Sequence, residues 1–209
     1  TGLHVSNLQN PAKGVSLSQL AQEIRACTLC QEILEPRPML RVHPESRILL
    51  VGQAPGSKVH ASGIPWDDAS GEHLIEWLDV DRAQFEDPRN FAIVPMAFCY
   101  PGRGKSADLP PPARCGETWH ARLLGMLDNV SLTLVVGQYA HKFVLGKARK
   151  RSLTETVRHF PEYGPTAIPL PHPSWRSRGW MKRNPWFEAD LLPTLRGRIA
   201  ELLDTTENK

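Results

Sequence analysis

The stretch Arg47-Ile48-Leu49-Leu50-Val51-Gly52-Gln53-Ala54-Pro55-Gly56 is the clearest indicator of the fold. Four consecutive apolar residues lead into a glycine, and a short run that is apolar at every position is typical of a parallel strand buried on both faces. The runs 91–98, 132–137 and 167–171 have a similar apolar character, although Pro95 weakens the first of them as a strand. The chain therefore contains four candidate strands.

Segments with helical spacing of apolar residues surround these strands. Residues 16–34 are predicted to form a helix, because apolar residues recur at three- and four-residue intervals behind a possible N-cap at Ser16 or Ser18. Further helices are predicted over residues 70–78, 116–127, 139–145 and 185–202, the last broken near Pro193. This alternation predicts an α/β fold with three layers, α/β/α, around a central, mostly parallel four-stranded sheet. We expect residues 1–209 to form a single domain with a frayed polar tail at 204–209.

Composition limits the class of protein. The 209 residues are 41% hydrophobic and 22% charged, which is ordinary globular usage and argues against a disordered chain. No apolar run approaches the roughly 18 residues that cross a bilayer, and no signal peptide is recognisable, so we expect a cytoplasmic protein without a membrane partner. The formal net charge of +3 permits a nucleic-acid partner without requiring one. A monomer is the default expectation.

Three loops are expected to meet at the carboxyl ends of the strands, where doubly wound sheets bind ligands: residues 52–68, 99–115 and 171–183. In the first loop, the glycines around Pro55 allow a tight turn that approaches a ligand closely. Trp66 either stacks on a flat ligand or packs in the core. Asp67 or Asp68 could act as a base or water-positioning group; the alternative is a cap for the helix that follows, which Asp68 and Ser70 would suit.

The third loop combines cations with aromatic rings. Between residues 171 and 186 there are four Lys or Arg, no Asp or Glu, and three tryptophans, a combination that suits phosphates and unstacked bases. His172 lies between two prolines at a strand end, so its rigid placement suits a hydrogen-bonding catalyst. This loop favours a nucleic-acid partner.

The four cysteines are Cys27, Cys30, Cys99 and Cys115. The first two form a C-x2-C pair, which places two sulfurs on one turn, and the later two would complete a four-thiolate site for zinc or an iron–sulfur cluster. Disulfides, a redox C-x-x-C pair and scattered buried thiols are the other interpretations. Spacing alone does not separate zinc from iron–sulfur.

Taken together, these motifs resemble the uracil-DNA glycosylase superfamily, and most closely its iron–sulfur branch, often called family 4. That branch has a G-E-A-P-G motif, then six residues, then G-x-P-F and A-G. The matching residues here are Gly52-Gln53-Ala54-Pro55-Gly56, Gly63, Pro65-Trp66 and Ser70-Gly71. The branch's H-P-S motif is His172-Pro173-Ser174, and its cluster ligands resemble the four cysteines. Three positions differ: Gln53 replaces an acidic residue, Trp66 replaces the stacking phenylalanine, and Pro95 replaces the asparagine that reads uracil.

The resemblance implies a monofunctional DNA glycosylase of base excision repair, which hydrolyses the bond between a deaminated base and its sugar. It implies that His172 donates a hydrogen bond to the leaving base and that Gln53, Asp67 or Asp68 positions the water. The base would lie against Gly52, Ala54, Pro55, Gly56, Trp66 and Pro95, and DNA would contact Ser174, Trp175, Arg176, Arg178, Lys182 and Arg183. A [4Fe-4S] cluster on Cys27, Cys30, Cys99 and Cys115 would be structural, with residues 16–34 as its N-terminal helix. The alternatives are a non-catalytic module that binds damaged or single-stranded DNA, and a different α/β enzyme that holds a phosphate at residues 52–56.

Overall fold

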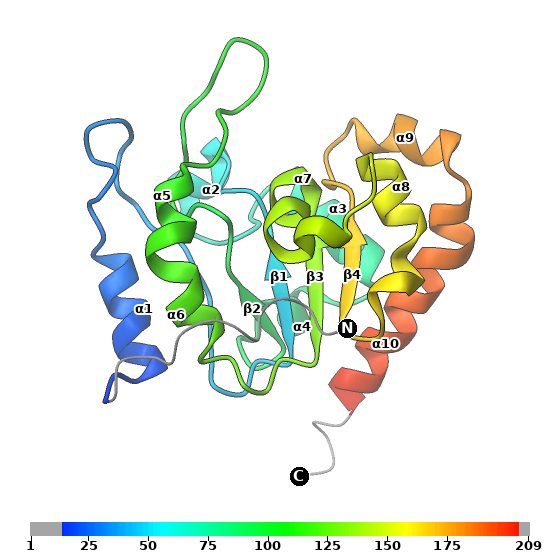
Figure 1. Ribbon diagram of the computed structural model, residues 1–209, viewed down its shortest axis with the longest axis horizontal. Helices are drawn as coiled ribbons and strands as arrows, with labels where there is room; N and C mark the ends of the chain where they lie inside the picture. The colour runs from blue at the N-terminus through cyan, green and yellow to red at the C-terminus, as the bar shows by residue number, and fades with distance from the viewer. Residues whose placement is uncertain (1–13, 205–209) are drawn as a thin grey trace.

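The computed structural model describes residues 14–204. The central sheet has four strands, all parallel, in the order β2-β1-β3-β4 (Figure 1). The strands are β1 (Ile48–Val51), β2 (Phe91–Ile93), β3 (Leu132–Val136) and β4 (Ala167–Leu170). Most of the tail predicted to fray, residues 205–209, lies outside the described residues. Within residues 14–204, no helix is both long and apolar enough to cross a membrane.

Alternate strand residues face two separate cores, which makes the molecule three-layered as predicted. Ile48 and Leu50 pack on one side with the helices α3 (Ala69–Leu78) and α10 (Leu192–Asp204). Leu49 and Val51 pack on the other side with α1 (Leu17–Arg25) and α6 (Ala121–Leu124). Burial of the strands on both faces explains why their sequences are apolar at every position.

The remaining helices are short. They are α2 (Ser57–Ser62), α4 (Arg82–Glu86), α5 (Ala113–Cys115), α7 (Gly137–Ala140), α8 (Leu153–Arg158) and α9 (Ser177–Arg183). Turns of π-helix cover Gly116–His120, His141–Leu145 and Phe187–Leu191, and 3-10 turns cover Gly146–Ala148 and Phe160–Tyr163. The helices α2, α4, α8 and α9 were not predicted, because segments of five to seven residues are too short to show a period clearly.

The predicted helix 16–34 was too long. Ser16 caps α1 in a capping box with Gln19, as expected of a serine there, but the helix ends at Arg25. The residues after it form turns, and Leu29 and Ile33 are exposed, so the apolar spacing does not continue into a buried face. This segment instead carries Cys27 and Cys30 on a turn.

The other predicted elements changed mainly at their ends. Strand β2 stops at Ile93, two residues before Pro95, although Val94 and Met96 still donate hydrogen bonds to the carbonyls of Leu50 and Gly52. The predicted break near Pro193 appears as a switch from π-helix to α-helix between Leu191 and Leu192. Pro193 is compatible with this change of hydrogen-bond pattern because a proline has no backbone N–H that must find a partner.

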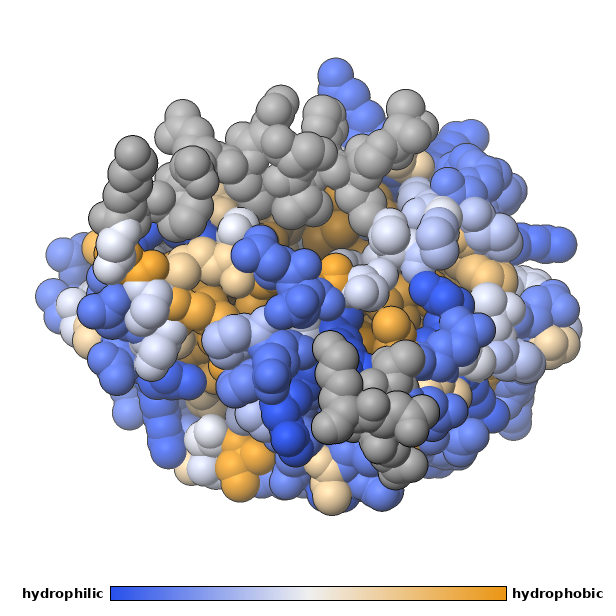
Figure 2. All heavy atoms as spheres, turned by 90° about the horizontal axis from the view of Figure 1, so that it is seen from below, coloured by the Kyte–Doolittle hydropathy of each residue, from blue (hydrophilic) through white to orange (hydrophobic). Residues whose placement is uncertain are grey.

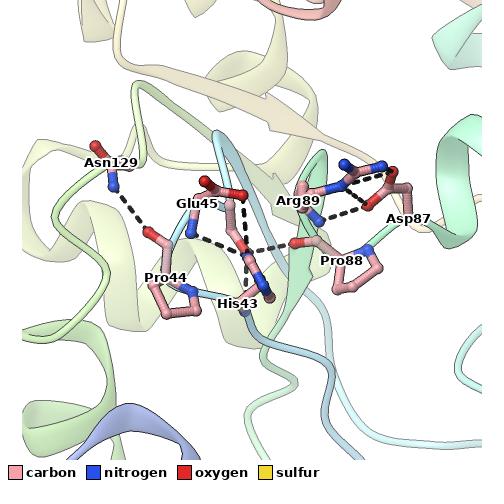
Figure 3. Close-up of polar contacts among 8 residues, drawn as sticks. His43, Pro44, Glu45, Asp87, Pro88, Arg89 and Asn129 are labelled. Atoms are coloured by element: carbon pink, nitrogen blue, oxygen red, sulfur yellow. Dashed lines mark hydrogen bonds and ion pairs between the residues drawn. The ribbon is translucent and has the colours of Figure 1, made fainter. Parts of the chain in front are cut away.

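At the amino ends of the strands, polar groups bond to one another (Figure 3). The buried Ser46 hydroxyl donates to the Pro88 carbonyl at 2.6 Å and accepts from the backbone N–H of His43 at 3.0 Å. Asn129 donates to the Pro44 carbonyl at 2.8 Å, which joins this corner to the loop before β3. Seen from this end, the surface outside the grey atoms is mostly hydrophilic with separate apolar patches (Figure 2).

Candidate functional site

A cavity of about 460 Å³ lies at the carboxyl ends of the strands, where the three loops meet. The loop after β1, the hairpin that follows Tyr100 and the segment after β4 all contribute to its wall. The predicted site residues that line it are Gly52, Gln53, Ala54, Pro55, Gly56, Trp66, Asp68, Pro95, His172, Ser174 and Arg176. The loops 52–68, 99–115 and 171–183, which were expected to meet at the carboxyl ends of the strands, thus line the same cavity.

Trp66 is fixed in the cavity wall by two glycines. Its backbone is left-handed, with φ of 62°, which is uncommon for a bulky residue. A Cβ on Gly71 would lie 1.7 Å from the Trp66 carbonyl oxygen, and a Cβ on Gly52 would lie 3.1 Å from Cζ2 of its ring. Position 71 therefore needs glycine, whereas a Cβ at position 52 would require the Trp66 ring to give by a few tenths of an ångström. The half-buried ring packs against the core and also lines the cavity, so its core packing is confirmed and its stacking on a ligand stays a prediction.

His172 lies across from that ring. The two ring centroids are 6.0 Å apart, and the planes are inclined at 34°. Burial lowers the pKa of His172, and the negative charges of Asp68 and Asp108 act in the opposite direction. A neutral imidazole keeps one N–H donor without adding a positive charge. The backbone is held by a hydrogen bond from Ser174 N–H to the His172 carbonyl, at 2.8 Å, between two buried prolines.

The two neighbouring aspartates have different positions. Asp68 accepts hydrogen bonds from the N–H groups of Ser70 and Gly71 through Oδ1, both at 2.9 Å, so it is the N-cap of α3. Its other oxygen faces the turn at Gly56, 3.6 Å from where a Cβ would stand. Asp68 therefore serves as a cap and also lines the cavity. Asp67 is exposed and is not part of the cavity wall, so the structure brings only one of the pair to the site.

The structure adds Asp108, Arg103 and Ala107 to the cavity wall. Sequence reasoning missed them because they stand in an irregular loop where no spacing or motif marks an inward side chain. The loop between Cys99 and Cys115 was flagged as functional only through its position after β2. That position is the signal by which Asp108 would have been found.

Pro95 lines the cavity but offers it no hydrogen-bonding side chain. Its carbonyl is 2.9 Å from Nε2 of His120, and Nδ1 of the same ring is 3.3 Å from the Cys115 carbonyl. The ring is buried and stacked on Phe98, with centroids 5.3 Å apart, and burial lowers the pKa of His120. The floor of the cavity is therefore connected to the segment that carries Cys115.

The basic, aromatic segment after β4 divides into an inner and an outer part. Trp180 and Trp186 pack against the core and each other, and Trp180 Nε1 donates to Thr154 Oγ1 at 2.8 Å. Of the three tryptophans in this segment, these two therefore contribute to the core. Trp175 is 76% exposed, with the Arg176 guanidinium 5.2 Å from its ring centroid. The predicted DNA contacts Arg178, Lys182 and Arg183 are exposed on α9.

All four cysteines are free thiols that line one small pocket, beside Pro36, Pro38 and Phe98. Burial, together with repulsion from the neighbouring cysteines, raises the pKa of Cys99 to about 11. In the described part of the chain, no three His, Cys, Asp or Glu side chains are grouped so as to hold a metal ion. The predicted cysteines are therefore gathered, while the metal itself stays a prediction.

The part of the chain that holds this site also matches a known protein family. The model of the uracil DNA glycosylase superfamily matches residues 41–196. The chain belongs to this superfamily. The matched range contains the whole sheet, the motif at Gly52–Gly56 and His172, so membership supports a DNA glycosylase-type function and a DNA partner for this uracil-DNA glycosylase fold. Cys27 and Cys30 precede the matched range, and the match does not distinguish the iron–sulfur branch from the rest of the superfamily.

Proposed function

We propose that this protein is a monofunctional DNA glycosylase that releases a deaminated base, uracil or a related lesion, as a step of base excision repair in the cytoplasm. The observation that carries the proposal is the placement of His172 opposite Trp66 in one cavity. An aromatic face and a rigid neutral donor are what the extraction of a base from the DNA stack requires.

The chemistry follows from these positions. The flipped base stacks on Trp66, and its bond to C1′ of the sugar breaks with the electron pair moving onto the base. The N–H of His172 donates a hydrogen bond to the negative charge that develops there. Loss of one such donor typically slows a reaction by a factor of about 10²–10³. Gln53 and Asp68 orient the water, while Gly52, Ala54, Pro55 and Gly56 surround the base with backbone.

DNA contacts are proposed for the segment after β4. Ser174 and Arg176 line the mouth of the cavity and contact phosphates, as do the cations of α9. The exposed ring of Trp175 enters the gap that the flipped base leaves in the duplex.

A [4Fe-4S] cluster on the four cysteines is part of the proposal. The donor set suits it, because four thiols on one pocket are the ligand set of such clusters. A cluster also spaces its thiolates further apart than a single ion does, which is compatible with the lack of a tight three-residue group among residues 14–204. The cluster would supply structural rigidity, holding the turn after α1 against the loop that carries Cys99 and Cys115.

One observation favours a second function, a module that binds lesions without cleaving them. Pro95 and Gln53 stand where a base-reading amide and an acidic group are expected from the family pattern. Neither residue can accept a proton from water. The glycosylase stands ahead of this alternative because Asp68 and Asp108 supply carboxylates to the same cavity.

A base-release panel tests the proposal. Oligonucleotides that carry uracil, hypoxanthine or xanthine, single- and double-stranded, are incubated with the protein and then cleaved with hot alkali. Cleavage by the wild type that is lost in His172→Ala supports the glycosylase. Binding of these oligonucleotides with no cleavage of any of them, by folded protein, rejects it in favour of the binding module. Iron and sulfide analysis of anaerobically purified protein tests the cluster separately.

A further inference from the structure

The loop between β2 and α5 brings a carboxylate over the cavity. The Leu109 N–H donates to the Gly102 carbonyl at 2.9 Å and the Gly104 N–H donates to the Ala107 carbonyl at 2.8 Å, which closes a short hairpin. In Figure 1 this loop is the green segment that rises above the carboxyl end of the sheet. Asp108 lies in this hairpin, and its side chain lines the same cavity as His172.

Two carboxylate oxygens converge at the turn of the first motif. Oδ2 of Asp108 lies 4.0 Å and Oδ2 of Asp68 lies 3.6 Å from the position of a Cβ on Gly56. The absence of a side chain at Gly56 therefore leaves a small space between the two acids. Both negative charges also reach His172, since each one acts on its ionisation.

Asp108 is held by Tyr100, and the Tyr100 ring in turn contacts α2. The Tyr100 hydroxyl donates to Asp108 Oδ1 at 3.3 Å. The Tyr100 ring lies 5.8 Å from the ring of His60 in α2, and His60 Nε2 is 3.1 Å from Glu35 Oε2. Because Asp68 uses Oδ1 to cap α3, whereas Asp108 is bound by a side-chain hydroxyl at the edge of the cavity, the two acids suit different tasks.

We propose that Asp108 is a catalytic residue that takes the proton of the attacking water, which Gln53 and Asp68 orient, and that the charges of both carboxylates stabilise the positive charge on the sugar. This inference rests on the proposed glycosylase function. The C1′–N bond breaks, its electron pair leaves with the base, and C1′ becomes cationic. The water oxygen then forms the C1′–O bond, its proton moves to the Asp108 carboxylate, and that proton passes to solvent. The products are the free base, after protonation, and an abasic sugar.

Asp108→Asn tests the inference, because the amide keeps the size and an acceptor for Tyr100 but cannot take a proton. Single-turnover release of the base that the wild type accepts is expected to slow by roughly 10²-fold, the lower range for a general base. The Kd for lesion DNA is expected to change less than threefold, roughly, since no phosphate contact is lost. Asp128→Asn, at an exposed carboxylate of the loop before β3, is the matched control and keeps the wild-type rate.

A second measurement does not need turnover. DNA with a protonated pyrrolidine in place of the sugar mimics the cation, and DNA with tetrahydrofuran is its neutral counterpart. The wild type is expected to prefer the cation, and Asp108→Asn is expected to lose roughly tenfold of this preference, because a nearby charge is removed. Wild-type release rates in Asp108→Asn overturn the inference and leave the proposed function standing. A wild type that releases no base overturns the proposed function, and an unchanged cation preference in Asp108→Asn then overturns this inference as well.

Discussion

The two ends of the sheet use polar groups in opposite ways. At the amino ends, Ser46 and Asn129 donate hydrogen bonds to backbone carbonyls of neighbouring loops, so their polar groups hold these loops together (Figure 3). At the carboxyl ends, glycine and proline turns leave a cavity in which His172 and Asp108 line the wall. The comparison teaches that strand direction decides which end of an α/β scaffold carries the site, because the loops at the carboxyl ends converge around it.

The largest effect on stability is expected at the site end, from Gly71→Ala. Its Cβ would lie 1.7 Å from the Trp66 carbonyl oxygen, so α3 or the loop must move. We expect a loss of about 3 kcal/mol in unfolding free energy, the upper part of the range for overpacking. Because Trp66 also moves, base release is expected to fall as well. Chemical denaturation and release assays check both, and a variant with native stability would show that the glycine contact is relaxed in solution.

His141→Leu tests a hydrogen-bonded contact at the carboxyl ends of β3 and β4, next to the site. Nε2 of His141 is 2.9 Å from the Val135 carbonyl and 3.0 Å from the Leu170 carbonyl, at the ends of β3 and β4. In the variant, neither buried carbonyl receives this hydrogen bond, and we expect the unfolding free energy to fall by about 1–3 kcal/mol at pH 8. Denaturant midpoints measured at pH 8 check this cost, with Asp128→Asn as a variant expected to keep the wild-type midpoint.

The same histidine gives a pH dependence with a defined sign. Burial lowers the pKa of His141 from its ordinary 6.5, so the unfolded chain binds a proton where the folded chain does not. The wild type is therefore expected to lose stability as the pH falls below 6.5, and the difference from His141→Leu is expected to narrow there. Denaturation between pH 8 and 5 measures it, and a difference that stays constant over this range would contradict a neutral buried imidazole.

Ser46→Ala tests the hydrogen bonds at the amino ends of the strands. The variant removes a donor from the Pro88 carbonyl and an acceptor from the His43 N–H, and we expect a loss of about 1–2 kcal/mol in unfolding free energy. Base release and DNA affinity at a temperature where the variant is folded are expected to match the wild type. A slowed release in folded Ser46→Ala would mean that the two ends are not independent.

Trp175→Ala is expected to have the smallest effect on stability, within about 0.5 kcal/mol, because its side chain is 76% exposed. Its main effect is expected on the affinity for DNA. Loss of one stacking ring is expected to weaken lesion-DNA binding by about 1–3 kcal/mol, measured by fluorescence anisotropy. Trp180→Phe is a poor control, since that ring packs against the core, so the matched control is Asp128→Asn, at an exposed carboxylate before β3, which is expected to keep wild-type binding.

Much of the fold follows from local chemistry that the sequence displays. The apolar runs at 48–51 and 132–136 identify strands because both faces of the sheet are covered. Asp68 was recognisable as a helix cap. The rule that loops at the carboxyl ends of parallel strands meet predicted that the loops of His172 and Trp66 lie together. These features depend on residues close in sequence or on strand direction alone.

Other features depend on contacts that no spacing reveals. The exposure of Leu29 and Ile33 ends the first helix early, and the inward packing of Trp180 depends on Thr154 and Phe187. Asp108 reaches the cavity because a hairpin of irregular sequence folds over it. In each case the deciding feature is a contact or an exposure in the folded chain that leaves no periodic pattern in the sequence.

The central claim, that chemistry resides at the carboxyl end of the sheet, is tested most directly by one assay. Released base is quantified by mass spectrometry under single-turnover conditions for the wild type, His172→Ala and Ser46→Ala, on the same lesion oligonucleotides. The account predicts release by the wild type and Ser46→Ala at equal rates, and a rate lower by about 10²–10³ in His172→Ala. Equal release by wild type and His172→Ala would contradict it.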